Sequence, residues 1–512
     1  MTNWERGDHF VKSTEHALKI DPRDTVAVAL DRIPRGEKLV IEDFVLTALD
    51  EIPTGHKIAV TDHGVGANVM KYGHSIGHVT EAVQKGQWIH SHNMRTGLSG
   101  KVAYAYVPEP VPMAKEVDQS SPRLFDGYVR ENGDIGIRNE IWIINTVGCI
   151  NKTAEQLARM ADDQFRGEGI DGVYSFAHPY GCSQLGDDLQ YTQKILAGLV
   201  RHPNAAGVLI LGLGCENNRI DVFQPFLGER QEKRVKFLSV QEVADELAAG
   251  MALISDLVAY ARTFERTSVP LSALRVGLKC GGSDGFSGMT ANPLVGALSD
   301  ALVEEGGTTL LTEVPEMFGA ETILMNRASS AEVFEDIVHL IDDFKDYYTR
   351  HGQVIYENPS PGNKEGGITT LEEKSLGCIQ KGGRGPVRGV LSYGEPVTAR
   401  GLHLVQAPGN DMVSVTALIA AGAHLVLFTT GRGTPMGGAV PTVKISSNSA
   451  LFERKSNWID FDAGSLVHEG AIADLRDDLH RLIVEVASGR RYARNEVHGF
   501  REIAIFRDGV TL

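Results

Sequence analysis

AGVLILG, at residues 206–212, is a continuous run of apolar residues and glycine bounded by polar segments. Similar runs precede and follow it: IWIINTV at 141–147, GVYSFAH at 172–178 and RVKFLSV at 234–240. Helical patterns separate them, from about residue 153, over 187–200 and over 241–263. Uninterrupted apolar strands that alternate with helices are typical of a parallel sheet that helices cover on both faces. These runs therefore predict an α/β domain over residues 126–265.

The same alternation resumes further along the chain. LRVGLK at 274–279, TTLLTEV at 308–314, HLVLFTT at 424–430 and WIDFDAG at 458–464 have the length and composition of buried strands. Residues 264–273 (FERTSVPLSA) are predicted to link the two alternating regions. The fold class expected is α/β with mainly parallel sheets, and residues 266–512 form a second, C-terminal α/β domain.

The first hundred residues follow a different pattern, with a short internal repeat. LDRIPRGEK at 30–38 recurs as LDEIPTGHK at 49–57, and 82–89 is a degenerate third copy. Ile-Pro-x-Gly is turn chemistry that leads into a strand, because Pro fixes φ and Gly accepts positive φ. A small β-rich domain is predicted over residues 1–106. Residues 107–125, rich in Pro and polar side chains, are expected to be a linker.

Composition excludes several classes of protein. The 512 residues carry a net charge of −16 without a long basic run, which argues against binding of nucleic acid. No stretch reaches the length of a membrane span, and the polar N-terminus MTNWERGDHF lacks the apolar core of a signal peptide. Five cysteines in so long a chain do not make a disulfide framework. We expect a cytoplasmic enzyme with reduced thiols.

Cysteines gather at the ends of predicted strands. Cys149, Cys182, Cys215 and Cys280 each follow one of the apolar runs. In open α/β sheets ligands bind outside the carboxyl ends of the strands, where the first three thiolates could hold Fe(II) or Zn(II). The alternative is that each is a small buried residue beside a glycine turn. Cys378 is interpreted as structural.

Histidines form a second group. His90 and His92 are two residues apart in WIHSHN, which would place both imidazoles on one face of a strand, a spacing that chelates one ion. His56 begins the neighbouring strand and could approach them. The alternative is a set of surface or hydrogen-bonded histidines.

Two polar glycine loops offer groups that bind anions. NPSPGNK at 358–364 contains Asn363 and Lys364, and TTGRGTP at 429–435 contains Arg432 and Thr434. Arg suits a carboxylate, whereas Lys acts as a point charge or a base. Neither loop has the GxxxxGK[ST] or GxGxxG pattern, so no nucleotide cofactor is expected. As isolated loops, both are better interpreted as tight structural turns.

Motifs along nearly the whole chain resemble the altronate/galactarate dehydratase family. They include GHKIAVTDHGVGANVMKYGHSIG, HPYGCSQLGDD, LGLGCENN, CGGSDGFSGMTANP, TTLLTEVPEMFGAE, YENPSPGNKEGGITT and TTGRGTP. The IHSHN and YGCSQLGDD segments are similar to the altronate branch rather than the galactarate branch. The resemblance implies an N-terminal domain of the SAF type and dehydration of D-altronate to 2-dehydro-3-deoxy-D-gluconate. It also implies a divalent metal ion, Fe(II) or Mn(II).

Such a reaction removes the C2 proton beside a carboxylate and expels the C3 hydroxyl, so charge on the intermediate must be neutralised. The candidate bases are His56 and Lys364. The candidate metal ligands are His90, His92, Cys149, Cys182 and Cys215. The candidate substrate contacts are Asn93, Ser283, Asp284, Asn363, Arg432 and Thr434.

Three other readings stay open. The chain could dehydrate galactarate or another sugar acid by the same chemistry. An iron–sulfur cluster held by Cys149, Cys182 and Cys215 could replace the single ion. A non-catalytic sensor of sugar acids is the reading from a different class. The expected partners are a small sugar acid and, in a homo-oligomer, further copies of the chain.

Overall fold

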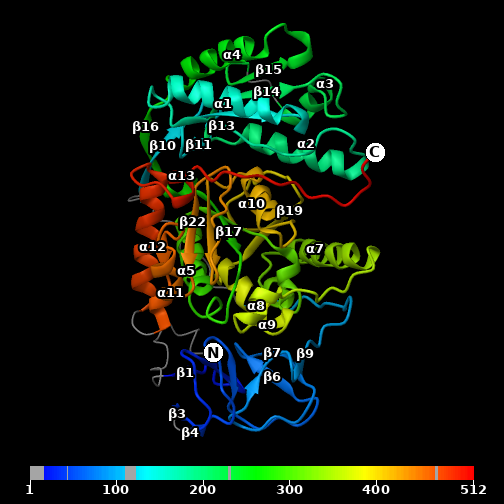
Figure 1. The fold of residues 1–512 in the computed structure, drawn as a ribbon, viewed down its shortest axis with the longest axis vertical. Helices are drawn as coiled ribbons and strands as arrows, with labels where there is room; N and C mark the ends of the chain where they lie inside the picture. Colours follow the sequence, from blue (N-terminus) through cyan, green and yellow to red (C-terminus); the bar gives the residue numbers. More distant parts are fainter. Residues whose placement is uncertain (1–15, 43, 110–122, 229–231, 468–470) are drawn as a thin grey trace.

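The computed structural model describes residues 16–42, 44–109, 123–228, 232–467 and 471–512 (Figure 1). Its long axis runs through three parts. The N-terminal module (blue) lies at one end, the region of α1, α2 and α4 lies at the other, and the C-terminal domain lies between them. Most of the predicted linker, residues 110–122, falls outside the described residues.

The N-terminal module is built from short strands, as predicted. They are β1 (Ala17–Leu18), β2 (Val26–Ala29), β3 (Lys38–Ile41), β4 (Phe44–Thr47), β5 (Lys57–Ala59), β6 (Asn68–Lys71), β7 (His74–Val79), β8 (Trp88–Ile89) and β9 (Met94–Arg95). They form the sheets β1-β2-β5-β8, β3-β4 and β6-β7-β9. Ile33 bridges Ile52 in the two predicted repeats, and His63 bridges Val83 in the same way. Residues 61–70 are thus a further copy that the sequence did not reveal.

The middle domain has a four-stranded parallel sheet in the order β13-β12-β14-β15. Its elements are β12 (Glu140–Asn145), α1 (Asn151–Phe165), β13 (Gly172–Ser175), α2 (Gly186–Arg201), β14 (Ala205–Gly212), α3 (Ile220–Phe223), β15 (Val235–Ser239) and α4 (Glu246–Ala261). Side chains of α1 and α4 cover one face, and those of α2 cover the other. The predicted parallel sheet, with helices on both faces, is confirmed.

The segment predicted to link the two α/β domains is a strand, so that prediction is wrong. Residues 266–270 form β16 (Arg266–Pro270), which pairs antiparallel with β10 (Leu124–Val129) beside β11 (Ile135–Gly136). Polar residues in FERTSVPLSA made it resemble a linker. One face of this three-stranded sheet is exposed, which is why the strand carries polar side chains.

The C-terminal domain has a seven-stranded parallel sheet in the order β19-β20-β18-β17-β21-β22-β23. Its strands are β17 (Arg275–Cys280), β18 (Thr308–Leu311), β19 (Val387–Leu391), β20 (Gly401–Val405), β21 (Leu425–Thr430), β22 (Thr442–Ser446) and β23 (Phe461–Asp462). Its helices are α5 (Ala291–Glu304), α6 (Glu321–Met325), α7 (Ala331–Arg350), α8 (Pro361–Glu365), α9 (Leu371–Cys378), α10 (Asp411–Ala420), α11 (Ser449–Arg454), α12 (Ile472–Ala487) and α13 (Arg494–Val497). Within the described ranges, no helix combines the length and apolarity that a membrane crossing needs.

The two α/β domains share one hydrophobic core. Helix α2 of the middle domain packs against α10 of the C-terminal domain, and both contribute buried side chains to it. Gly198 permits the close approach, because a Cβ there would lie 2.6 Å from the carbonyl oxygen of Ala420. The carboxyl ends of the seven-stranded sheet remain available to the loops described below.

Candidate active site

The N-terminal module meets the C-terminal domain through backbone contacts between glycines. Gly55, just before β5, lies between the loop after β17 and the loop after α8. The amide of Gly285 donates a hydrogen bond of 2.7 Å to the carbonyl of Gly366. A Cβ on either Gly285 or Gly367 would overlap the Gly55 carbonyl. This junction therefore requires glycine, and it brings together the CGGSDG and GNKEGG motifs.

His56, the residue after Gly55, has both ring nitrogens occupied. Its Nδ1 accepts a hydrogen bond of 3.2 Å from the indole N–H of Trp88. Since an indole only donates, Nε2 carries the proton and donates to the carbonyl oxygen of Glu365, 3.1 Å away. Burial lowers the pKa of His56, which keeps the ring neutral. In this arrangement the imidazole holds the end of α8, and neither nitrogen is free to accept a substrate proton.

His90 and His92 do not share a strand face, so that prediction is wrong. Strand β8 ends at Ile89, and the chain then turns, with the Asn93 amide donating to the carbonyl of His90. His90 is buried as a result, and His92 is exposed. The Asn93 side chain is used within this turn, since its Oδ1 accepts from the His90 amide and its Nδ2 donates to the carbonyl of Trp88.

His90 nevertheless reaches the C-terminal domain. Its Nδ1 lies 2.9 Å from the hydroxyl of Thr369, and its ring centroid lies 4.8 Å from that of His56. Burial, with a contribution from Lys57, lowers the pKa of His90 to about 3. Within the described parts of the chain its Nε2 has no hydrogen-bond partner. His90 is thus a neutral imidazole with one nitrogen available to a ligand.

The buried His90 should make the protein sensitive to mild acid. Unfolding returns its pKa from about 3 to about 6.5, so below pH 6.5 the unfolded chain binds a proton that the folded chain does not. The melting temperature of the wild type should therefore fall between pH 6.5 and 5, and His90→Gln should fall less. His92→Gln, at the exposed neighbour, should follow the wild type. Equal pH slopes for wild type and His90→Gln would contradict this account.

A buried carboxylate, that of Glu373, joins the N-terminal module to the C-terminal domain. Glu373 in α9 accepts from Lys57 of β5 and Lys71 of β6, each at 2.8 Å, and all three side chains are at most 1% exposed. Burial alone would raise the pKa of Glu373, but the two ammonium groups lower it to about 2. Burial lowers the pKa of Lys57 to about 8. The three charges hold the N-terminal module against α9.

Asp284, predicted to contact the substrate, organises the loops through hydrogen bonds. The carboxylate accepts from the Ser287 amide and hydroxyl, from the Ser447 hydroxyl at 2.7 Å and from Asn448 at 2.9 Å. Burial raises the pKa of Asp284, and these hydrogen bonds oppose the rise. Its acceptor positions are filled, so it fixes the CGGSDG loop beside the loop after β22.

Two neighbouring residues were also predicted to contact the substrate, and only one of them has all its hydrogen bonds satisfied. Asn363 donates to the carbonyl of Ser283 at 2.8 Å and accepts from Lys374 at 3.1 Å and Ser360 at 2.9 Å, so its amide is satisfied. The Ser283 hydroxyl is buried and has no hydrogen-bond partner in the described structure. A buried polar atom without a partner is costly unless a ligand or water completes it. Ser283 is therefore the best-supported substrate contact of this set.

Two predicted residues, Arg432 and Lys364, lie at the rim of the junction, and Thr434 follows Arg432 in the same loop. Arg432 pairs with Glu365 at 3.0 Å, and both side chains are about half exposed or more. Lys364, in α8, is half-buried and forms no ion pair with another described residue. The Thr434 hydroxyl accepts from the Met436 amide at 3.3 Å. Lys364 and Arg432 thus supply positive charge beside Ser283 and the glycine loops.

The three cysteines predicted as ligands lie in the middle domain. Cys149, Cys182 and Cys215 follow β12, β13 and β14, as expected, and all are exposed. Backbone hydrogen bonds from Gly148 to Tyr180 and from Asn218 to Gly181 connect their loops. This domain and the N-terminal module lie at opposite ends of the molecule (Figure 1). The structure therefore does not bring the cysteines together with His90 and His92.

A different pair of thiols is close together and buried. Sγ of Cys280, at the end of β17, lies 3.3 Å from Sγ of Cys378, at the end of α9. Both thiols approach one carboxylate oxygen of Glu316, at 3.3 Å and 3.1 Å. The other oxygen of Glu316 is 2.8 Å from the Lys374 ammonium. Among the described residues, these three are the group of His, Cys, Asp and Glu side chains placed to share an ion.

Further charges surround these thiols. Glu313 adopts a left-handed conformation (φ 72°), accepts from the Cys280 amide at 2.9 Å and pairs with Lys279. Lys381 lies 3.4 Å from the same carboxylate. The hydrogen bond to Cys280, together with burial, raises the pKa of the Cys378 thiol. Sequence reasoning missed this centre because Cys378 ends a helix rather than a strand.

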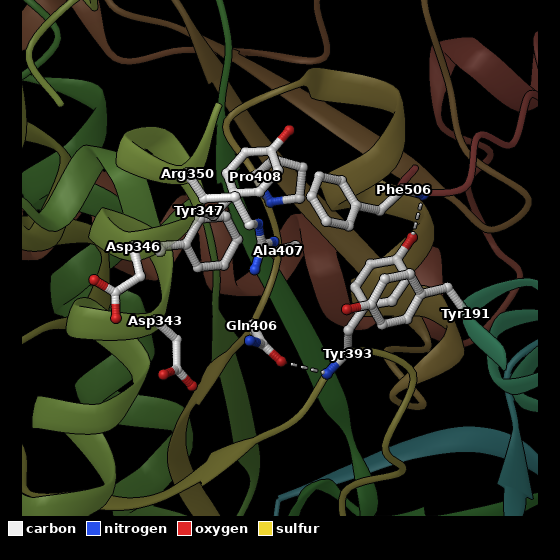
Figure 2. A pocket seen from close by; sticks show the side chains of 11 residues that line it. Tyr191, Asp343, Asp346, Tyr347, Arg350, Tyr393, Gln406, Ala407, Pro408 and Phe506 are labelled. Atoms are coloured by element: carbon white, nitrogen blue, oxygen red, sulfur yellow. Dashed lines mark hydrogen bonds between the residues drawn. The ribbon is translucent and has the colours of Figure 1, made fainter. Parts of the chain in front are cut away.

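A cavity of about 290 Å³ is lined by residues of the middle and C-terminal domains (Figure 2). Its lining includes the aromatic side chains of Tyr191 from α2, Tyr347 from α7, Tyr393 and Phe506. Arg350 lines it too, but pairs with Asp508. None of the predicted site residues lines this cavity. The glycine junction, and not this cavity, gathers the predicted substrate and base residues.

Comparison with known proteins gives matches over almost the whole chain. Residues 15–97 match the model of the altronate/galactarate dehydratase SAF domain. Residues 127–262 match that of the D-galactarate dehydratase/altronate hydrolase second domain. Residues 271–511 match that of the D-galactarate/altronate dehydratase C-terminal domain.

Individual relatives agree with these matches. The chain is 51% identical to an altronate dehydratase of Bacillus subtilis and 49% identical to one of Escherichia coli, each over 97% of this chain and 99% of the relative. It is 30% identical to the galactarate dehydratase (L-threo-forming) of Escherichia coli, over 93% of this chain and 90% of the relative.

Proposed function

Since the chain belongs to the altronate/galactarate dehydratase family, we propose that it is a hydro-lyase that converts D-altronate to 2-dehydro-3-deoxy-D-gluconate. One observation carries the choice of substrate. Identity is 51% and 49% to two altronate dehydratases over nearly full length, but 30% to a galactarate dehydratase. The five cysteines are free in the structure, which supports a reducing, cytoplasmic location.

The reaction removes the elements of water from C2 and C3. A base takes the C2 proton, the C3 hydroxyl leaves as water after protonation, and the enol becomes the 2-keto acid by moving its hydroxyl proton to C3. We assign proton abstraction to Lys364, because His56 has no free nitrogen. Arg432 would hold the carboxylate, and the unpartnered Ser283 hydroxyl a sugar hydroxyl. His56 positions the α8 loop that carries Lys364.

A divalent ion, Fe(II) or Mn(II), is part of this proposal, and when bound it would stabilise negative charge on the intermediate. The five predicted ligands cannot hold it together, because they lie in two distant domains. Cys280, Glu316 and Cys378 fit an ion by distance and donor chemistry. An iron–sulfur cluster on Cys149, Cys182 and Cys215 is the alternative that the connected loops of the middle domain support.

The substrate is tested by offering a panel of sugar acids to the purified full chain. Formation of a 2-keto acid should be fastest with D-altronate, measured as kcat/KM, and slower with galactarate and other aldonates. Tight binding of altronate without any product, in metal-supplemented enzyme, would instead favour the non-catalytic sensor. A higher kcat/KM for galactarate would move the assignment to the other branch of the family.

Removing the ion should abolish turnover. After anaerobic treatment with a chelator and desalting, altronate dehydration should fall at least 100-fold, since charge stabilisation of this kind contributes several kcal/mol. Adding back Fe(II) should restore the rate more fully than Mn(II), and Ca(II) should not restore it. Full activity of the stripped enzyme, with metal analysis showing less than a tenth of an equivalent, would exclude metal assistance.

A further inference from the structure

We propose that Cys280, Glu316 and Cys378 form a binding site for one thiolate-preferring divalent metal ion, such as Fe(II) or Zn(II). The three side chains are buried, at 2%, 3% and 4% exposure. They come from the end of β17, the segment after β18 and the end of α9. The assignment rests on the proposed function for the role of the ion in catalysis, but the site itself is argued from its contacts.

The donor atoms are already close to the arrangement that an ion requires. The sulfurs are 3.3 Å apart, and each lies within 3.3 Å of the same oxygen of Glu316. A tetrahedral ion about 2.3 Å from each sulfur would separate the sulfurs by about 3.8 Å. Side-chain movements of about half an ångström would therefore admit the ion.

The charged groups around the two thiols give the site the same total charge before and after an ion binds. The lysines are Lys279, Lys374 and Lys381, and the carboxylates are Glu313, Glu316 and Asp411. With both thiols protonated, these six charges cancel. Binding of a divalent ion forms two metal–sulfur bonds and releases two thiol protons to solvent, so the total charge of the buried centre does not change.

Neighbouring groups hold the proposed ligands in place. Glu316 has one oxygen directed at the thiols, while its other oxygen accepts from Lys374 at 2.8 Å and from Asn358 at 3.3 Å. Hydrogen bonds of this kind orient a carboxylate ligand and are typical of metal sites. Glu313 fixes the end of β17 by accepting from the Cys280 amide at 2.9 Å. Glu316 and Cys280 are therefore held in their observed positions by neighbouring groups.

The centre is connected to the glycine junction by one side chain. The Lys374 ammonium contacts both Glu316 and the Asn363 amide oxygen, and Asn363 in turn donates to the carbonyl of Ser283. An ion in this position would thus lie beneath the proposed substrate contact. Two sulfur ligands select Fe(II) or Zn(II) and disfavour Mg(II), Ca(II) and Mn(II), which prefer oxygen.

The test is X-ray absorption spectroscopy of the full-length wild-type protein, loaded anaerobically with one equivalent of Zn(II) and separately of Fe(II). We expect two sulfur neighbours at about 2.3 Å together with oxygen neighbours. A shell without sulfur would overturn the assignment. Three sulfurs would also overturn it, because they would indicate Cys149, Cys182 and Cys215. This measurement needs no substitution and so does not depend on the folding of a variant.

Matched variants locate the sulfurs. In Co(II)-loaded protein, the sulfur-to-cobalt absorption band should lose about half its intensity in Cys280→Ser or Cys378→Ser. It should be unchanged in Cys149→Ser and Cys182→Ser, whose thiols are exposed. The reverse pattern would place the ion in the middle domain. Sulfur-bound metal without altronate turnover would leave this site standing and refute the proposed function, whereas turnover with sulfur-free metal would do the opposite.

Discussion

Replacing Lys364 with alanine should lower kcat for altronate dehydration by about 10²- to 10⁴-fold, the usual contribution of a positioned base. Lys364 is the amine of the GNKEGG motif, and it forms no ion pair with any other described residue. His56 positions its loop through the carbonyl of Glu365. Because the base acts on bound substrate, KM should change much less than kcat. Steady-state kinetics on metal-loaded enzyme provides the measurement.

Lys364→Arg distinguishes a base from a simple counter-charge. Arginine keeps the positive charge but does not deprotonate, so its kcat should stay as low as that of the alanine variant. Lys152→Ala, which removes an exposed lysine of α1, should behave like the wild type. Recovery of most of the activity in Lys364→Arg would assign Lys364 to binding of the carboxylate and leave the base unidentified.

Apolar runs predicted all four strands of the middle-domain sheet and several of the C-terminal sheet, and missed others whose burial depends on tertiary partners. β12, β14 and β21 contain continuous apolar runs and were expected. β20 and β22 were not, since His403 and Lys444 interrupt them. Both side chains are buried, at 3% and 1% exposure, among groups that the sequence does not identify as neighbours. The spacing of apolar residues and the composition of these segments therefore could not identify β20 and β22 as strands.

Candidate site residues could be predicted where they lie close together in the sequence, within one short motif. The glycine motifs mark backbone contacts, so Ser283 and Lys364 could be proposed from them, and their roles stay predictions. Cys280 and Cys378 are 98 residues apart, on a strand and on a helix, and no spacing rule joins them. The Lys57–Glu373 pair crosses from one domain to another, which one sequence alone does not show. Long-range pairing, rather than residue type, was the missing information.

Replacing Glu373 with glutamine should destabilise the protein by about 3–5 kcal/mol, the cost of leaving buried charges without their partner. Lys57 and Lys71 both contact this carboxylate at 2.8 Å, and each is at most 1% exposed. Glutamine keeps the size and one acceptor oxygen, but it leaves two buried ammonium groups uncompensated. We expect the N-terminal module to detach from α9 first, because these charges hold the two parts together. Urea unfolding, with limited proteolysis to identify the released module, measures the effect.

Glu365→Gln provides the matched control in the same part of the chain. Its carboxylate pairs with Arg432 at 3.0 Å, but the two side chains are 68% and 48% exposed. Water screens such a pair, so its loss should change stability by no more than about 1 kcal/mol. The contrast between two identical substitutions isolates burial as the cause. If both variants unfolded at the urea concentration of the wild type, the Lys57–Glu373–Lys71 contacts would not be what holds the N-terminal module in place.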